Sequence, residues 1–246
     1  LLHSCSLPSL NPGNSPTFCA SNCRMMDISS IQDRIAQYKG EGKELFATSS
    51  FQTHSIPLLH IISRIDDGIP IYYLNTGYLF PETIAFKDEI AKRLGLQVTG
   101  LQSPVPKSQQ KDADGNLLFT SDPGYCCYLN KTKPLEPILA EYDIWINGIR
   151  ADQSPQREQM QVEEQAPFDT VRFHPMLDWN SKMILDYRKK YELPEHPLHG
   201  EGYISIGCEP CTRKWNPEGD ERSGRWSGLN KTECGLHTDL VENKES

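Results

Sequence analysis

The sequence predicts an α/β fold with a mostly parallel, doubly wound sheet, and three observations carry this prediction. Short apolar runs alternate along the chain with longer segments whose apolar residues recur at helical spacing. One run, residues 69–74, is continuously apolar, as a strand covered on both faces is. Polar loops follow the runs, which is where parallel sheets bind ligands. Strands that alternate with helices in this way imply helices on both faces of one sheet.

The first two strand–helix units are expected between residues 44 and 94. Residues 44–50 form a short apolar run that ends in small hydroxylic side chains. The helix after this run has its apolar face at Leu58, Ile61, Ile62 and Ile65. The strand at 69–74 precedes a helix with its apolar face at Phe86, Ile90 and Leu94. The polar loops at 48–55, 75–77 and 148–157 are therefore expected at one edge of the sheet.

Further strands are expected near 96–102 and 143–148, and further helices across about 125–140 and 180–191. From Thr212 onward the periodicity is lost and Gly, Arg, Trp and charged residues dominate. We expect three parts: a leader at 1–26 that is unstructured and possibly not native, an α/β domain at 27–212, and a flexible tail at 213–246.

Charge and hydropathy limit the partners of the chain. It has 25 basic and 33 acidic residues, and the net charge of −8 disfavours nucleic acid and anionic membranes unless basic residues gather at one place. No apolar run approaches the roughly 20 residues that a membrane helix needs. Residues 1–24 lack the basic start and continuous apolar stretch of a secretory signal. We expect a cytoplasmic protein that binds neither nucleic acid nor membrane and keeps its thiols reduced.

Eight cysteines divide into groups of different meaning. Three lie in the expected leader, at Cys5, Cys19 and Cys23. Four more form two close pairs, at Cys126, Cys127, Cys208 and Cys211. Four thiols are the number that an iron–sulfur cluster or a structural zinc ion requires, and separate buried or disulfide-bonded thiols are a third interpretation. Adjacent cysteines on a helix diverge by about 100°, so reaching one metal centre requires a bent backbone, which Pro123 and Gly124 can supply.

The loop at 49–55 joins the first strand to its helix. Its backbone N–H groups and the hydroxyl groups of Ser49, Ser50, Thr53 and Ser55, beside Phe51, can cradle a phosphate at the start of the helix. The loop lacks the glycines and lysine of the usual triphosphate-binding loop. A serine or threonine that only caps the helix explains the same residues.

Basic residues gather near these motifs, at Lys131, Lys133, Arg150, Arg157, Arg222 and Arg225. Between 213 and 231 there are five basic and three acidic residues, so the local sign of the charge is opposite to that of the whole chain. An anionic ligand would explain the clustering, whereas each residue taken singly is also an ordinary solvated surface charge.

Cys234 stands apart from the paired cysteines, in a segment that also contains Arg225, Lys231 and His237. Neighbouring cations lower the pKa of a thiol and so produce a nucleophilic thiolate at neutral pH. The alternative is an exposed cysteine without a role.

Six ordered motifs resemble the sulfonucleotide reductases of assimilatory sulfate reduction. They are SSFQTHS at 49–55, LNTGYLFPET at 74–83, the cysteine pair followed by Lys131, GIRADQSPQR at 148–157, LPEHPLHGEGYISIGCEPCTR at 193–213 and GRWSGLNKTECGLH at 224–237. The chain has Asn75 and Asn130 where that family often has Asp and Arg. The resemblance implies a fold of the PP-loop, or adenine nucleotide alpha hydrolase-like, type.

The resemblance also implies an activity. Paired cysteines mark the branch of the family that holds one 4Fe–4S cluster and acts on adenylyl sulfate (APS), whereas the branch that acts on the 3'-phosphorylated nucleotide (PAPS) usually lacks them. The Cys234 thiolate would attack the sulfur of APS, AMP would leave, and reduced thioredoxin or a glutaredoxin-like donor would release sulfite from an S-sulfocysteine, a step toward cysteine biosynthesis.

Site residues follow from the resemblance motif by motif. Cys234, His237 and Lys131 would be catalytic, and the four paired cysteines would bind the cluster. The substrate would contact the loop at 49–55, the adenosine-bordering residues Leu74, Asn75, Thr76 and Gly77, and the cations Arg150, Arg157, Arg222 and Arg225. A PAPS reductase, an adenylating enzyme of the same fold and a zinc-binding module without enzymatic activity are the competing hypotheses.

Overall fold

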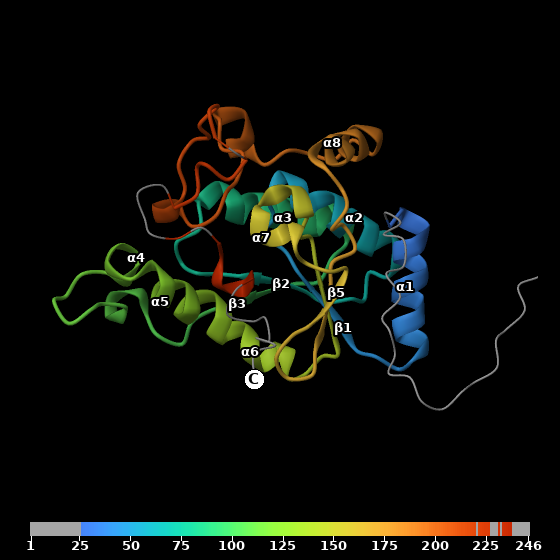
Figure 1. The fold of residues 1–246 in the computed structure, drawn as a ribbon, viewed down its shortest axis with the longest axis horizontal. Helices are drawn as coiled ribbons and strands as arrows, with labels where there is room; N and C mark the ends of the chain where they lie inside the picture. Colours follow the sequence, from blue (N-terminus) through green and yellow to red (C-terminus); the bar gives the residue numbers. More distant parts are fainter. Residues whose placement is uncertain (1–25, 220, 227–230, 232, 238–246) are drawn as a thin grey trace, which may run out of the picture.

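The computed structural model describes residues 26–219, 221–226, 231 and 233–237, and within them a single six-stranded sheet forms the centre of the molecule (Figure 1). The strand order is β3-β2-β1-β4-β6-β5. All neighbouring strands pair in parallel except β5, which is antiparallel to β6. The prediction of a mostly parallel, doubly wound sheet is confirmed.

Four strands lie where the apolar runs predict them. They are β1 (Leu45–Thr48), β2 (Ile71–Leu74), β3 (Val98–Leu101) and β4 (Ile144–Asn147). The edge strand β5 (Glu163–Gln165) and its neighbour β6 (Val171–Phe173) were not predicted. Each has only three residues, and a charged residue interrupts the apolar pattern of β6. That residue, Arg172, is fully buried with its guanidinium 4.6 Å from the ring centroid of Trp145, so tertiary contacts allow a charge inside the sheet.

Helices cover both faces of the sheet. The larger core packs four helices against one face: α1 (Ile28–Gly40), α2 (Ile56–Ile65), α3 (Pro81–Leu94) and α8 (Ser181–Lys190). Ala47 of β1 belongs to this core, whereas its neighbour Phe46 belongs to a smaller one, because adjacent strand residues face opposite sides. The smaller core packs Leu135 and Leu139 of α6 (Lys133–Leu139) against Phe46 and Trp145. The helices predicted after 44–50, after 69–74 and at 180–191 are confirmed.

The helix expected across 125–140 consists of three consecutive segments. Helix α5 (Pro123–Cys127) begins at the proline, leads into a π-helical turn (Tyr128–Thr132) and continues as α6. Asn130, inside the turn, donates to the carbonyl oxygen of Cys126 at 2.9 Å and to the side-chain oxygen of Gln110 at 2.6 Å. A π-helical turn thus directly follows the cysteine pair, whereas Pro123 and Gly124, where the sequence analysis places a bend, form the start of α5.

The described parts of the predicted tail pack on the domain. The backbone of Arg225 pairs with that of Thr212 in an isolated antiparallel β-bridge. Trp226 is buried, and Leu236 packs against the smaller core beside α6. Figure 1 draws this last segment in red beside the sheet and α6. The flexibility of the tail stays a prediction. The expected leader lies outside the described residues except for Met26, whose carbonyl accepts a hydrogen bond from the Trp179 indole at 3.0 Å.

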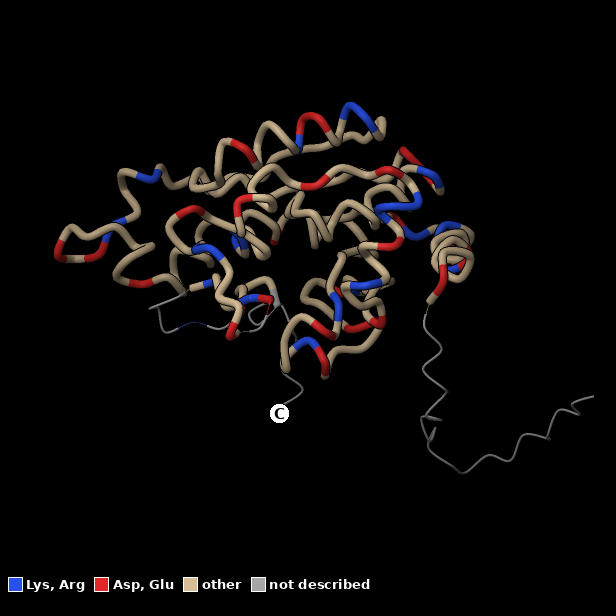
Figure 2. The backbone as a smooth tube through the Cα atoms, turned by 90° about the horizontal axis from the view of Figure 1, so that it is seen from above, with Lys and Arg blue, Asp and Glu red and all other residues tan. Residues whose placement is uncertain are grey.

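The described residues contain two further, short α-helices: α4 (Leu118–Ser121) and α7 (Pro155–Glu158). No helix in the described part of the chain is long and apolar enough to cross a membrane. Lys and Arg are interspersed with Asp and Glu along the backbone (Figure 2). Any concentration of positive charge therefore comes from side chains that fold toward one place.

Candidate active site

A cavity of about 180 Å³ lies at the carboxyl ends of β1, β2 and β4, where Thr48, Leu74 and Asn147 end their strands. Its walls also include the loop after β1, the segment that precedes Cys208, and the tail. The position agrees with the general rule that open parallel sheets bind ligands beyond the carboxyl ends of their strands.

Of the residues predicted to be catalytic or to bind substrate, ten line this cavity: Ser49, Ser50, Phe51, Leu74, Thr76, Lys131, Arg157, Arg222, Arg225 and Cys234. Five others do not line it: Thr53, Ser55, Asn75, Gly77 and Arg150. His237 ends a 3-10 turn (Gly235–His237), and its side chain lies outside the described residues. The cavity thus joins residues that lie far apart in the sequence, from Ser49 to Cys234.

The loop at 49–55 is held by its own hydroxyl groups and by a distant segment. The Ser50 and Ser55 hydroxyl groups are 3.1 Å apart, and the Ser49 hydroxyl accepts the N–H of Phe51 at 3.1 Å. The Ile206 N–H donates to the Gln52 side chain at 2.7 Å, which ties the loop to the segment before Cys208. Ser55 precedes α2 but makes no capping hydrogen bond with its side chain. The interpretation of these residues as a simple helix cap is therefore not supported.

The thiol of Cys234 meets the ammonium group of Lys131 in the cavity, with 3.7 Å between sulfur and nitrogen. Burial raises the pKa of this thiol, but Lys131, the backbone N–H of Leu236 and Arg225 together outweigh burial and hold the pKa below its ordinary value. Burial likewise opposes the charge of Lys131, yet the neighbouring thiol groups keep its pKa above the usual range. The pair favours a thiolate beside a protonated lysine.

Three arginines add positive charge to the same cavity. Arg157 comes from α7, and Arg222 and Arg225 come from the tail. The guanidinium groups of Arg222 and Arg225 lie 5.2 and 4.5 Å from the ring centroid of Trp226, which holds both side chains in place. With Lys131, these residues give the cavity four cations that can hold an anionic ligand.

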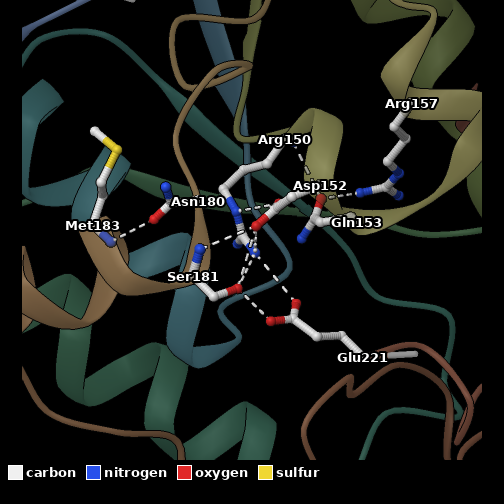
Figure 3. Close-up of polar contacts among 8 residues, drawn as sticks. All are labelled: Arg150, Asp152, Gln153, Arg157, Asn180, Ser181, Met183 and Glu221. Atoms are coloured by element: carbon white, nitrogen blue, oxygen red, sulfur yellow. Dashed lines mark hydrogen bonds and ion pairs between the residues drawn. The ribbon is translucent and has the colours of Figure 1, made fainter. Parts of the chain in front are cut away.

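Arg150 has a different position from the one that the sequence analysis expects. Its guanidinium donates to Asp152 at 2.9 Å, to Ser181 at 3.0 Å and to Glu221 of the tail at 3.3 Å (Figure 3). It is almost fully buried and outside the cavity lining. Arg150 thus connects the loop after β4 to the start of α8 and to the tail.

A second, small cavity contains the four paired cysteines. Cys126, Cys127, Cys208 and Cys211 all line it, although 80 residues separate the two pairs. The five described cysteines are not disulfide-bonded. Thr76, Lys131 and Cys208 line both cavities, so the cysteine group lies directly beside the cavity that contains Cys234.

The cysteines of the second cavity lie in buried surroundings rich in thiols. Burial, followed by the neighbouring thiols, raises the pKa of Cys126 to about 12, and burial also raises the pKa values of Cys127 and Cys211. Thiols crowded in this way become thiolates when a metal cation binds them. The Thr76 hydroxyl lies 3.2 Å from the Cys208 sulfur, and the Asn130 amide donates to the Cys126 sulfur at 3.6 Å. Among the described His, Cys, Asp and Glu residues, no three converge closely enough for a single ion.

Several residues of the main cavity were missed by the sequence analysis. They include Lys87, Asn147 and the segment 205–207, whereas His54 and Gln153 lie in loops that the sequence analysis places at this edge of the sheet. Asn147 ends a predicted strand, and residues 205–207 directly precede Cys208, so position relative to a recognised element could have indicated both. Burial, followed by the charge of Arg150, lowers the pKa of His54 to about 3, so this ring is neutral. Nothing in the sequence pattern predicts that environment.

Comparison with known proteins agrees with this geometry. Phosphoadenylyl-sulfate (PAPS) reductase from Candida auris superposes with a TM-score of 0.60 at 19% identity, over 72% of this chain and 87% of that one. FMN adenylyltransferase from Candida glabrata superposes with a TM-score of 0.57 at 14% identity, over 89% of this chain and 72% of that one. These likenesses define the class of fold, which is the PP-loop type that the sequence analysis expects.

Residues 44–214 match the family of the phosphoadenosine phosphosulfate reductase domain. The adenosine 5'-phosphosulfate reductase of Chelativorans sp. is 38% identical over 214 residues, 86% of each chain. The phosphoadenosine 5'-phosphosulfate reductase of Gloeobacter violaceus is 40% identical over 202 residues, 80% of this chain and 83% of that protein. The chain belongs to the phosphoadenosine phosphosulfate reductase family, and it is an oxidoreductase of that family. The expected resemblance to sulfonucleotide reductases is confirmed.

Proposed function

We propose that this protein reduces adenylyl sulfate to sulfite and AMP through an S-sulfocysteine on Cys234, with thioredoxin or a glutaredoxin-like protein as the reductant. One observation carries the proposal: the Cys234 thiol lies 3.7 Å from Lys131 in a cavity that Arg157, Arg222 and Arg225 also line. A nucleophile with a lowered pKa and a set of cations are what attack on an anionic sulfur compound requires.

The reaction proceeds in two balanced steps. The Cys234 thiolate attacks the sulfur of the sulfate group, an S–S bond forms, and the bond between sulfur and the phosphate oxygen breaks with its electrons on AMP. A thiolate of the reductant then attacks the Cys234 sulfur, sulfite leaves with the electron pair of the S–S bond, and the second thiol of the reductant regenerates free Cys234. The reductant becomes a disulfide.

This chain's residues have separable tasks in those steps. Lys131 favours the thiolate and faces the charge of the sulfate group, while Arg157, Arg222 and Arg225 hold the negative oxygens of the nucleotide. The loop at 49–55 offers hydroxyl and N–H groups to the phosphate, and Leu74 and Thr76 border the adenosine. Arg150 is not assigned to the substrate because it does not line the cavity.

We further propose that Cys126, Cys127, Cys208 and Cys211 bind one 4Fe–4S cluster. Their common cavity and the side-chain contacts to two of the sulfurs support this assignment. When bound, the cluster would hold the two cysteine pairs together and so order the segments beside Lys131. Iron and acid-labile sulfide in protein purified without air would agree with this assignment, whereas stoichiometric zinc would support the binding module without activity.

Mass spectrometry after mixing with APS in the absence of reductant tests the central step. We expect an adduct with the mass of SO₃ on the peptide that contains Cys234, and none in Cys234→Ser. Absence of the adduct from the native chain would remove the proposal. Unchanged turnover of ATP by Cys234→Ser would instead support an adenylating enzyme.

Substrate choice has its own measurement. Sulfite release from equal concentrations of APS and PAPS, with reduced thioredoxin, decides between the two nucleotides. We expect APS to be preferred because the paired cysteines are present. The alternative is PAPS, which the name of the Gloeobacter relative supports.

A further inference from the structure

Glu233, the residue before Cys234, is a carboxylate buried among cations. Only 4% of it is exposed. Arg157 donates to both carboxylate oxygens, from Nε at 3.0 Å and from Nη2 at 3.1 Å. The Nη2 of Arg222 donates to one of the same oxygens at 2.7 Å. The hydroxyl of Ser154 donates at 3.2 Å. Glu233 is therefore held on one side by the domain, through Arg157 and Ser154, and on the other by the tail, through Arg222.

The domain fixes where this carboxylate lies. Arg157 belongs to α7 and is itself bonded to Gln153 (Figure 3), so its guanidinium has a defined position at the cavity wall. Burial raises the pKa of Glu233, but Arg157 outweighs burial and keeps the pKa below its ordinary value. A bidentate pair between a carboxylate and a buried arginine sets both distance and orientation.

The same carboxylate reaches the reactive residue through the backbone. The N–H of Cys234 donates to a Glu233 oxygen at 2.8 Å. The next side chain along the chain is the thiol, which lies 3.7 Å from Lys131. The residue that pairs with Arg157 and Arg222 and the residue whose thiol contacts Lys131 are thus adjacent in the chain.

We propose that Glu233 is a positioning residue: its carboxylate, clamped between Arg157 and Arg222, fixes the backbone of Cys234 so that the thiol meets Lys131. This inference deepens the proposed function, on which it rests. It gives a second task to Arg157 and Arg222, because both hold the tail as well as face the nucleotide.

Charge and position make opposite predictions for the variant Glu233→Gln, which keeps the shape of the side chain. The negative charge of Glu233 by itself raises the pKa of the Cys234 thiol, so removing only that charge would lower it. If the carboxylate positions the thiol beside Lys131, its loss separates the two groups and raises the pKa of Cys234. The direction of the change therefore distinguishes positioning from a simple charge effect.

The experiment is the pH profile of Cys234 alkylation by iodoacetamide, followed on the Cys234 peptide by mass spectrometry. In Glu233→Gln we expect the onset of alkylation to move to higher pH, with about a tenfold smaller thiolate fraction at pH 7 for each pKa unit. Glu233→Asp keeps the charge and should lie between the native chain and Glu233→Gln. AMP affinity, measured by calorimetry, should persist in both variants because Lys131, Arg157 and Arg225 remain.

Glu218→Gln is the matched control, since Glu218 is an exposed tail carboxylate for which the described residues show no ion pair. Its alkylation profile should equal that of the native chain. An onset in Glu233→Gln that stays in place or moves to lower pH, with AMP still bound, would overturn the inference. Alkylation does not require turnover, so absence of the SO₃ adduct from the native chain would remove the proposed reaction without changing this result.

Discussion

At the scale of single residues, the site depends on one thiol and one lysine. Cys234 and Lys131 are separated by 103 positions in the sequence, yet their side-chain termini lie 3.7 Å apart. Burial alone would raise the pKa of the Cys234 thiol and make it inert, and the lysine is the largest of the influences that reverse this effect. The reactivity of Cys234 is therefore a property of the pair.

The variant Lys131→Met tests this dependence. Without the charge of Lys131, the effect of burial dominates, so the pKa of Cys234 rises. The thiolate fraction at neutral pH then falls about tenfold for each pKa unit. Since only the thiolate reacts, iodoacetamide alkylation of Cys234 should begin at higher pH. The exposed neighbour Lys133, changed to Met, serves as control and should leave the profile unchanged. The same onset in Lys131→Met as in the native chain would contradict the pairing.

At the scale of elements, the π-helical turn between α5 and α6 organises the cysteine cavity. Asn130 and Gln110 exchange two hydrogen bonds, at 2.6 and 2.9 Å, and Asn130 also bonds the carbonyl of Cys126. Both side chains are buried, so each satisfies the other. The turn thereby joins the cysteine pair to the loop that precedes it.

We predict that Asn130→Ala lowers the metal content of the protein. The change leaves the Gln110 amide oxygen without its partner, and an unsatisfied buried polar group costs about 1–3 kcal/mol. Iron and sulfide per chain should fall, together with the midpoint of denaturant unfolding. Asn116→Ala, in the exposed turn at 112–116, is the comparison and should preserve both quantities. Full metal content in Asn130→Ala would show that the amide pair has no part in the site.

At the scale of the whole molecule, buried histidines make the fold sensitive to acid. Burial lowers the pKa of His196 to about 4 and that of His54 to about 3. Nδ1 of His196 accepts the N–H of Leu198 at 3.2 Å, and its Nε2 lies 2.9 Å from the Thr83 hydroxyl. Protonation of Nδ1 would abolish the first bond. Both rings are neutral in the folded protein.

Stability should therefore fall as the pH drops below about 6.5, the ordinary pKa of histidine. Between that value and the lowered folded pKa, the unfolded chain binds more protons than the folded one, so acid favours unfolding. Each such histidine contributes about 1 kcal/mol between pH 7.5 and 5.5. Urea unfolding at both pH values measures the difference in the free energy of unfolding. The variant His196→Gln should reduce this difference by the contribution of one histidine. Equal stability at the two pH values would contradict the assignment of neutral rings.

Residue order and spacing predicted the class of the sheet and the four strands β1 to β4, which the structure confirms. The runs of β1 and β4 are visible in sequence because these central strands are buried at nearly every position, whereas β2 and the edge strand β3 are only partly buried. The cysteine pairs, the serine-rich loop and the tail thiol were also recognisable, because their chemistry depends on residue type.

Only the tertiary structure decided which of these groups meet. It placed Arg150 beside Glu221, outside the cavity, and it placed Glu233 between two arginines. It also added β5 and β6, whose short segments satisfy their charges through contacts with distant residues. An arginine in a sequence gives no indication of whether a ligand or a carboxylate will neutralise it. That choice follows from the distances between segments, which the fold alone sets.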